Sequence, residues 1–127
     1  MPVLGIGVDL IRVERLTEAL GRFGARMEQR LFTEAERTYC RSHKDPLPHL
    51  AARFAAKEAA FKAIGTGLSA GVGWKDAEVH QPGGRQPRLE YHGRALEHFR
   101  ALGGDRTHLS ISHDGGFAVA CVVIEGP

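Results

Sequence analysis

The sequence predicts an α+β fold in a single domain spanning residues 1–127, and three observations support this prediction. First, the length of 127 residues, with 43% hydrophobic and 25% charged residues, is that of one ordinary globular domain. Second, candidate elements follow the order β-α-α-β-β-α-β-β, without regular parallel βαβ units. Third, hairpin signals join strands that are neighbours along the chain. We therefore expect an antiparallel sheet packed against a long central helix.

The chain begins with a strand and a helix. The apolar run at residues 3–8 predicts a buried first strand, with Asp9 at its end. Residues 11–31 have helical periodicity, although Gly21 and Gly24 can divide this helix in two.

The central helix has the clearest pattern in the chain. Residues 49–64 include seven alanines, and alanine is the best helix former. Pro48 suits the first turn of this helix, and Gly65 suits a left-handed cap at its end. The stretch before the helix is polar and contains two prolines, so we predict no regular element there.

The second half of the chain predicts four strands and one short helix. The expected strands are residues 76–80, 88–91, 107–113 and 117–124, and the helix is residues 93–102. The turn sequences Pro82-Gly83-Gly84 and Asp114-Gly115 lie between strands. Because residues 117–124 are all apolar, they are expected to form a central, buried strand.

Composition excludes several classes of protein. Seventeen basic and fifteen acidic residues give a net charge of +2, too balanced for a dedicated nucleic-acid-binding protein. The longest uncharged apolar run has eight residues, too short to cross a membrane. Two cysteines make no disulfide framework, the N-terminus does not resemble a signal peptide, and the histidines show no zinc spacing. We expect a cytoplasmic protein with its histidines scattered over the surface.

The central helix carries an acid beside a lysine. Glu58 and Lys62 are four residues apart and are therefore neighbours on one face, with Glu58 at the margin of the apolar positions Phe54 and Phe61. An acid in such a position is either paired or coordinates something. An ordinary surface ion pair is the simpler alternative.

Asp9 is the second candidate for chemistry. It can cap the following helix, although Arg12 stands where a capping box requires Glu or Gln. Alternatively, Asp9 and Glu58 supply oxygen ligands for Mg²⁺, which binds one or two carboxylates together with phosphate oxygens.

The strand at residues 107–113 separates apolar from polar side chains. Leu109 and Ile111 face one way, and His108, Ser110 and Ser112 face the other. An imidazole and two hydroxyls on one face can bind phosphate oxygens. A polar face exposed to solvent is the alternative.

The first helix carries a stripe of arginines. Five of them fall within an arc of roughly 80° if the helix is continuous: Arg12, Arg15, Arg22, Arg26 and Arg30. This arc lies beside an apolar one, which favours docking of an acidic helical partner. A solvated charged face is the alternative.

Together, these segments resemble the holo-acyl-carrier-protein synthases, the small bacterial 4′-phosphopantetheinyl transferases. The matching segments are residues 5–9 (GIGVD), 53–59 (RFAAKEA), Lys62, 65–67 (GTG) and 110–113 (SISH). The resemblance spans nearly the whole chain and implies the 4′-phosphopantetheinyl transferase fold.

The resemblance also implies a reaction. Such enzymes move phosphopantetheine from coenzyme A to a serine of apo acyl carrier protein and release adenosine 3′,5′-bisphosphate. Asp9 and Glu58 match the magnesium ligands. Glu58 would help to deprotonate the serine, directly or through a metal-bound water, and Lys62 would assist the departing phosphate; His113 is a second candidate base. Asp9, Glu58 and Lys62 are thus the candidate catalytic residues.

The resemblance further implies two binding surfaces and an assembly. The candidates for coenzyme A contacts are Arg53, Lys62, Gly65, Thr66, Gly67, His108 and Ser112. Arg15, Arg22 and Met27 would meet the acidic carrier protein. The family is trimeric with active sites between subunits, so a homotrimer is expected. A non-catalytic coenzyme A sensor and a structural subunit are the alternative functions.

Overall fold

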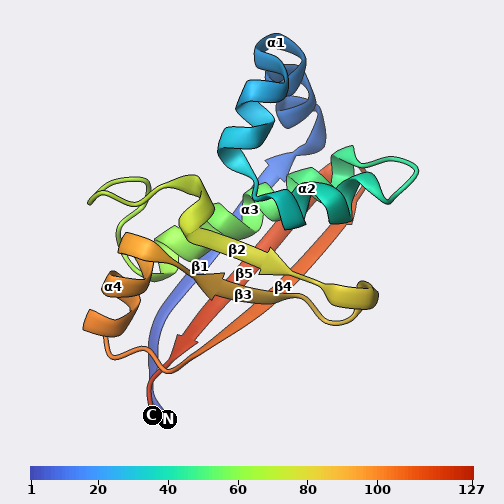
Figure 1. Ribbon diagram of the computed structural model, residues 1–127. Coiled ribbons are helices and arrows are strands. Elements are labelled where there is room, and N and C mark those ends of the chain that lie inside the picture. Colours follow the sequence, from blue (N-terminus) through green and yellow to red (C-terminus); the bar gives the residue numbers. More distant parts are fainter.

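A long helix, α3 (Leu47–Ala63), lies between two antiparallel sheets in the computed structural model, which describes residues 1–127 (Figure 1). The larger sheet has the strand order β1-β5-β4. The smaller sheet has two strands, β2 and β3, and its Tyr91 hydroxyl donates to the Ala60 carbonyl of α3, 2.7 Å away. The strands are β1 (Val3–Arg12), β2 (Ala77–His80), β3 (Arg88–Tyr91), β4 (Arg106–Asp114) and β5 (Phe117–Glu125).

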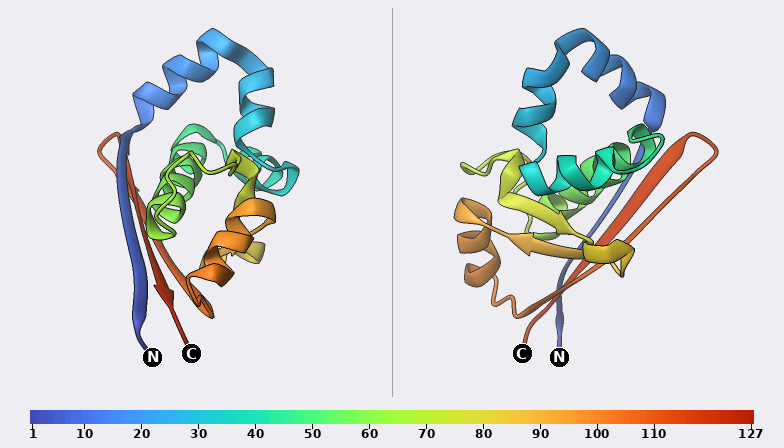
Figure 2. Two further views of the ribbon diagram at one scale, coloured as in Figure 1. Left: turned by 90° about the vertical axis from the view of Figure 1, so that its left-hand side faces the viewer. Right: turned by 45° about the vertical axis from the view of Figure 1, so that its right-hand side comes forward.

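The remaining helices surround this centre. They are α1 (Val13–Leu31), α2 (Glu34–Arg41) and α4 (Gly93–Ala101), and two short 3₁₀ turns, Trp74–Asp76 and Pro82–Gly84, flank β2. Figure 2 shows α1 arching at the end of the molecule opposite the two termini. None of the helices has the length and apolar character needed to cross a membrane.

Two glycines allow α3 to pack directly on β1. A Cβ atom at Gly5 would lie 2.0 Å from the Ala63 carbonyl oxygen, and one at Gly7 would lie 1.9 Å from the Ala59 carbonyl oxygen. These separations are far below van der Waals contact, so only glycine fits at either position. The alanines of α3 are buried in this closely packed region. This close packing brings Glu58 and Lys62 of α3 to the strand that carries Asp9.

The structure confirms the predicted fold class, and it corrects two element boundaries. β1 continues through Asp9 to Arg12, so Asp9 lies inside the strand and does not end it. The N-cap of α1 is Arg12, which rules out the capping role considered for Asp9. The strand extends because its residues as far as Arg12 pair with β5, where Arg12 faces Phe117.

Helix α2 was missed in the polar stretch, so the order is β-α-α-α-β-β-α-β-β. Its start is a capping box: the Thr33 amide donates to Glu36 Oε1 (2.8 Å), and the Glu36 amide donates to Thr33 Oγ1 (3.2 Å). The pattern Thr33-Glu34-Ala35-Glu36 is a helix-start signal that could have predicted this helix.

The predicted buried strand β1 is buried on one face only. Ile6, Val8 and Leu10 are 66%, 58% and 64% exposed on the face of the sheet that points away from α3. Gly7 and Ile11, on the opposite face, are buried. The larger sheet therefore has one face covered by α3 and one open apolar face.

Candidate active site

Asp9, Glu58 and Lys62 come together where β1 meets α3. Lys62 Nζ lies 3.2 Å from Asp9 Oδ1 and donates to the Val8 carbonyl oxygen at 3.0 Å. Lys62 therefore pairs with Asp9 rather than with Glu58, the partner expected for a helical i,i+4 pair. The strand and the helix thus contribute one cluster of three charged groups.

The electrostatics of the cluster favour a cation. The pKa of Glu58 is raised to about 6, first by burial and then by the charge and hydrogen bond of the neighbouring Asp9, while the positive charges of Lys62 and Arg15 oppose this increase. Two adjacent carboxylates repel each other when both are ionised, and a divalent cation relieves this repulsion. Their hard oxygen atoms beside an open cavity fit Mg²⁺.

A cavity of about 300 Å³ opens beside the two carboxylates. Its walls include Arg15, Met27 and Phe54 as well as Asp9 and Glu58. Met27 and Phe54 also line a neighbouring groove of about 450 Å³, together with Phe23, Arg26, Arg30 and Trp74. The charged cluster is therefore continuous with an apolar surface bordered by arginines.

The arginine stripe is not continuous. Gly24 has non-helical dihedral angles (φ 72°, ψ −159°), so α1 consists of two segments joined at a kink. The predicted arc is therefore wrong, because a single helical phase does not span the kink. Arg15 and Met27 still face the same cavity, whereas Arg22 lines a separate shallow depression beside Arg15.

The chain matches the family model of the 4′-phosphopantetheinyl transferase superfamily over residues 5–122. It belongs to this superfamily. It is similar to holo-[acyl-carrier-protein] synthase of Koribacter versatilis, with 49% identity over 97% of this chain and 98% of that protein.

Two solved structures show the same superfamily architecture. The holo-[acyl-carrier-protein] synthase of Neisseria meningitidis has a TM-score of 0.88 and 30% identity, covering 98% of this chain and 99% of that one. The Helicobacter pylori enzyme in complex with coenzyme A has a TM-score of 0.82 and 28% identity, covering 94% and 99%. The resemblance inferred from the motifs is confirmed.

The superfamily motif in α3 contains one arginine that is fully enclosed in this chain. Arg53 is 2% exposed, donates from Nη2 to Gln81 Oε1 at 2.6 Å, and lies over the Tyr39 ring at 4.3 Å from its centroid. Its Nε atom is buried without a hydrogen-bond partner. These contacts direct Arg53 toward α2 and β2 rather than toward Asp9 and Glu58.

The glycine motif after α3 closes the end of the helix. Gly65 has a positive φ of 81°, and the amides of Thr66 and Gly67 both donate to the Phe61 carbonyl oxygen, at 3.1 and 3.2 Å. These donors are the usual means of satisfying the last carbonyls of a helix. In this conformation the two amides are engaged within the chain.

The larger sheet separates two other predicted residues of the superfamily site from the charged cluster. Ser112 on β4 pairs with Val119 on β5, and Val119 pairs with Leu10 on β1. In the same way, His108 on β4 is linked through Val123 on β5 to Ile6 on β1. Residues directly opposite each other share a face of a sheet. His108 and Ser112 therefore lie on the open apolar face, and Asp9 lies on the face covered by α3.

The remaining motif positions have other partners. His108 Nε2 pairs with Glu125 Oε1. His113 is on the α3 side of the sheet and packs edge-on against His49, with ring centroids 5.2 Å apart. Trp74, which carried no sequence signal, stacks on Phe54 with ring centroids 5.0 Å apart and forms a wall of the apolar groove.

Proposed function

We propose that this protein transfers 4′-phosphopantetheine from coenzyme A to a serine of apo acyl carrier protein, which gives holo carrier protein and adenosine 3′,5′-bisphosphate. The observation that carries the proposal is the convergence of Asp9, Glu58 and Lys62 beside a cavity. The superfamily match and the names of the relatives agree with it.

The proposed chemistry is a phosphoryl transfer with a defined proton path. The serine oxygen attacks the phosphorus that carries the pantetheine arm, and the bond from this phosphorus to the bridging oxygen breaks. The bridging oxygen leaves with adenosine 3′,5′-bisphosphate. Glu58, with a pKa of about 6, is mostly ionised at neutral pH and accepts the serine proton.

Lys62 and Asp9 would neutralise or position charge during the transfer. Lys62, whose side chain is 53% exposed, lies at the open side of the cluster and neutralises negative charge on the departing phosphate. Asp9 and Glu58 would hold Mg²⁺, which neutralises pyrophosphate charge when bound. Asp9 also orients Lys62 through their ion pair at 3.2 Å.

The acidic carrier protein would dock on α1. Arg15 and Met27 line the cavity of the charged cluster, and Arg26 and Arg30 border the adjoining apolar groove. This arrangement combines apolar contact with charge attraction, which speeds encounter with an acidic partner. Arg22 extends the positive surface beside Arg15.

A homotrimer with active sites between subunits accounts for the two faces of the larger sheet. Ile6, Val8 and Leu10 form a row of exposed apolar side chains, and such a patch marks an interaction surface. His108 and Ser112 lie on this same face. A neighbouring subunit packed there would bring its own charged cluster to these residues, which is impossible within one chain.

The transfer is tested by mixing the protein with apo acyl carrier protein, coenzyme A and Mg²⁺ and measuring the mass of the carrier. A gain of one phosphopantetheine per carrier is expected. Asp9→Asn and Glu58→Gln should each slow the transfer at least about 100-fold. Glu97→Gln, at an exposed position on α4, is the matched control and should keep full activity.

A second measurement reports on the metal without relying on activity. Mg²⁺ should raise the melting temperature of the unmodified protein and of Glu97→Gln, but not that of Asp9→Asn. Absence of any mass gain would overturn the proposed reaction. A magnesium response that persists in Asp9→Asn would remove this residue from the metal site.

A further inference from the structure

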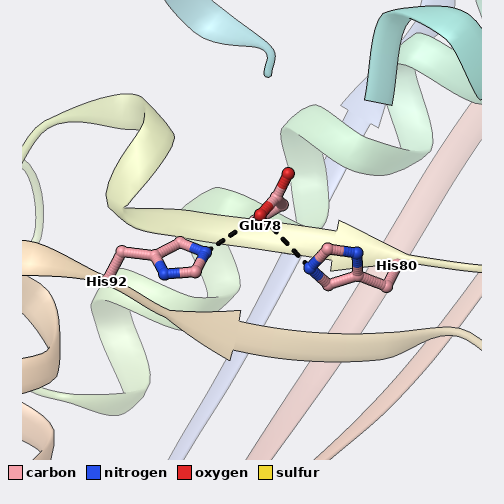
Figure 3. A group of neighbouring side chains, drawn as sticks. All are labelled: Glu78, His80 and His92. Carbon is pink, nitrogen blue, oxygen red and sulfur yellow. Dashed lines mark hydrogen bonds and ion pairs between the residues drawn. The ribbon is translucent and has the colours of Figure 1, made fainter. Parts of the chain in front are cut away.

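A second polar cluster lies outside the candidate active site, on the solvent side of the smaller sheet. Glu78 and His80 come from β2, and His92 directly follows β3 (Figure 3). Val79 and Leu89 point the other way and are buried. The expectation that the histidines are scattered is therefore wrong for His80 and His92, which the pairing of β2 with β3 brings to one carboxylate.

The ligand atoms of this cluster lie at distances that suit one bound ion. Glu78 Oε1 is 2.9 Å from His92 Nε2 and 3.2 Å from His80 Nε2, and both imidazoles turn toward it in Figure 3. The three ligand atoms all lie within 4.8 Å of one another. Ligands bonded to a tetrahedral zinc ion at its usual bond lengths are separated by about 3.3 Å.

We propose that Glu78, His80 and His92 form a binding site for a divalent transition-metal ion, with Zn²⁺ as the natural occupant. Two imidazole nitrogens and one carboxylate oxygen are a common zinc ligand set that leaves a fourth position open. Imidazole nitrogen suits zinc, whereas magnesium prefers oxygen ligands. The site therefore differs in chemistry from the carboxylate pair of Asp9 and Glu58.

The ring nitrogen of His80 provides an independent indication. His80 Nε2 is shielded from solvent and has no hydrogen-bond partner. It lies 3.2 Å from Glu78 Oε1 and 3.2 Å from Glu90 Oε2, within ion-pair distance of both, but it forms a hydrogen bond with neither. A buried nitrogen without a partner is costly, and coordination to an ion located between these side chains satisfies it.

The pairing of the strands adds a further reason for a cation. Glu78 and Glu90 stand directly opposite each other in the β2–β3 ladder, and like charges in opposed positions destabilise a sheet. A divalent ion between the strands compensates both charges. Glu90 is exposed and within reach of His80, so its carboxylate or a water can fill the fourth position.

Strand β2, which carries Glu78 and His80, is fixed by hydrogen bonds to side chains of α2 and α3. The Val79 amide donates to Glu36 Oε2 at 2.8 Å, and Lys57 Nζ donates to the Ala77 carbonyl oxygen at 2.6 Å. These contacts fix the backbone on both sides of Glu78. Ligands on a rigid element lose little freedom on binding, which increases metal affinity.

The test uses the full chain, freed of metal with a chelator and then titrated with ZnCl₂ in a calorimeter. One ion per chain is expected. His80→Asn and His92→Asn should each weaken zinc binding at least about 100-fold, since loss of a supporting contact alone weakens metal binding about 10–100-fold. His98→Asn, on α4, is the matched control and should bind as the unmodified protein does.

A second readout separates binding from folding. Zinc should raise the melting temperature of the unmodified protein and of His98→Asn, but not of His80→Asn, while all of them retain the same circular dichroism spectrum. Co²⁺ should give the visible absorption of a tetrahedral site in the first two proteins only.

Three outcomes would overturn the proposal. The first is no zinc binding by the unmodified protein, which would leave the cluster as a network of ion pairs. The second is zinc binding that is unchanged in both His80→Asn and His92→Asn. The third is binding lost only in His49→Asn, which would place the ion among the stacked rings of His43 and His49, whose centroids are 3.6 Å apart.

Discussion

Helix α3 carries two lysine–carboxylate pairs that differ in almost every physical respect. Lys57 Nζ lies 2.7 Å from Glu36 Oε1, and both side chains have no exposed surface. Lys62 Nζ lies 3.2 Å from Asp9 Oδ1, and its side chain is 53% exposed. The first pair is sealed between α2, α3 and β2, and the second opens onto a cavity.

The sealed pair of Lys57 and Glu36 has no free lysine proton left to bind a substrate. Lys57 also donates to the carbonyl oxygens of Trp74 (3.2 Å) and Ala77 (2.6 Å), which together with Glu36 use its three protons. Burial lowers the pKa of Lys57, and the charge and hydrogen bond of Glu36 oppose this change. Its function is structural: it joins α3 to α2 and to the start of β2.

The open pair retains its chemical capacity. Lys62 can reach solvent, and the third member of the cluster, Glu58, has a pKa raised to about 6. Lys57 and Glu58 are adjacent in the RFAAKEA motif, yet they point to different surroundings. One motif therefore contains a structural residue beside a candidate catalytic one, and burial distinguishes them.

The largest expected effect comes from breaking the sealed pair. Lys57→Met should lower the free energy of unfolding by about 3–5 kcal/mol, because it leaves the Glu36 carboxylate buried without its counter-charge. Chemical denaturation measures this loss. The double variant Lys57→Met/Glu36→Gln should recover part of the stability, and no recovery would mean that the ion pair is not the source of the effect.

Breaking the open pair should lower activity strongly and change stability little. Lys62→Met should slow the proposed transfer about 10²–10³-fold, the usual cost of removing one group that stabilises developing charge. Its free energy of unfolding should change by less than about 1 kcal/mol, because exposed ion pairs contribute little. Denaturation and carrier mass measurements on the same sample test both parts. A stability loss as large as that of Lys57→Met would contradict the comparison.

The smallest expected effect is a pH dependence of stability due to Glu58. Its pKa is about 6 in the folded protein, raised from 4.5, so protonated Glu58 favours the folded state. That contribution is complete below about pH 4.5 and is lost as the pH rises through about 6. Because the side chain is partly exposed, solvent screening reduces the loss to roughly 1 kcal/mol.

Metal-free protein and Glu58→Gln, unfolded in denaturant between pH 4.5 and 7.5, measure this contribution. The stability of the unmodified protein relative to the variant should fall as the pH rises, and Mg²⁺ at pH 7.5 should reverse the fall. A difference that stays constant with pH would show that Glu58 is not perturbed by its neighbours.

Local sequence signals were enough to predict most of the elements. The alanines of α3 and the glycine that ends it determine that helix. The β4–β5 hairpin was also predicted, although its turn is Gly115-Gly116, one position later than the predicted Asp114-Gly115, because Asp114 still pairs with Phe117. Helix α2 also had a local signal, the Thr33 capping box, which the two prolines further along the chain obscured. The candidate cluster was predicted because the motifs around Asp9 and Glu58 keep the spacing of a known family.

Only the tertiary structure decided how these elements use their side chains. The partners of Lys57, the two unequal faces of β1, the kink at Gly24 and the meeting of Glu78 with His80 and His92 all depend on packing. Periodicity places a residue on a face of its own helix or strand, since that depends on local backbone geometry. It does not determine what covers the face, because burial and pairing arise between segments far apart in the sequence.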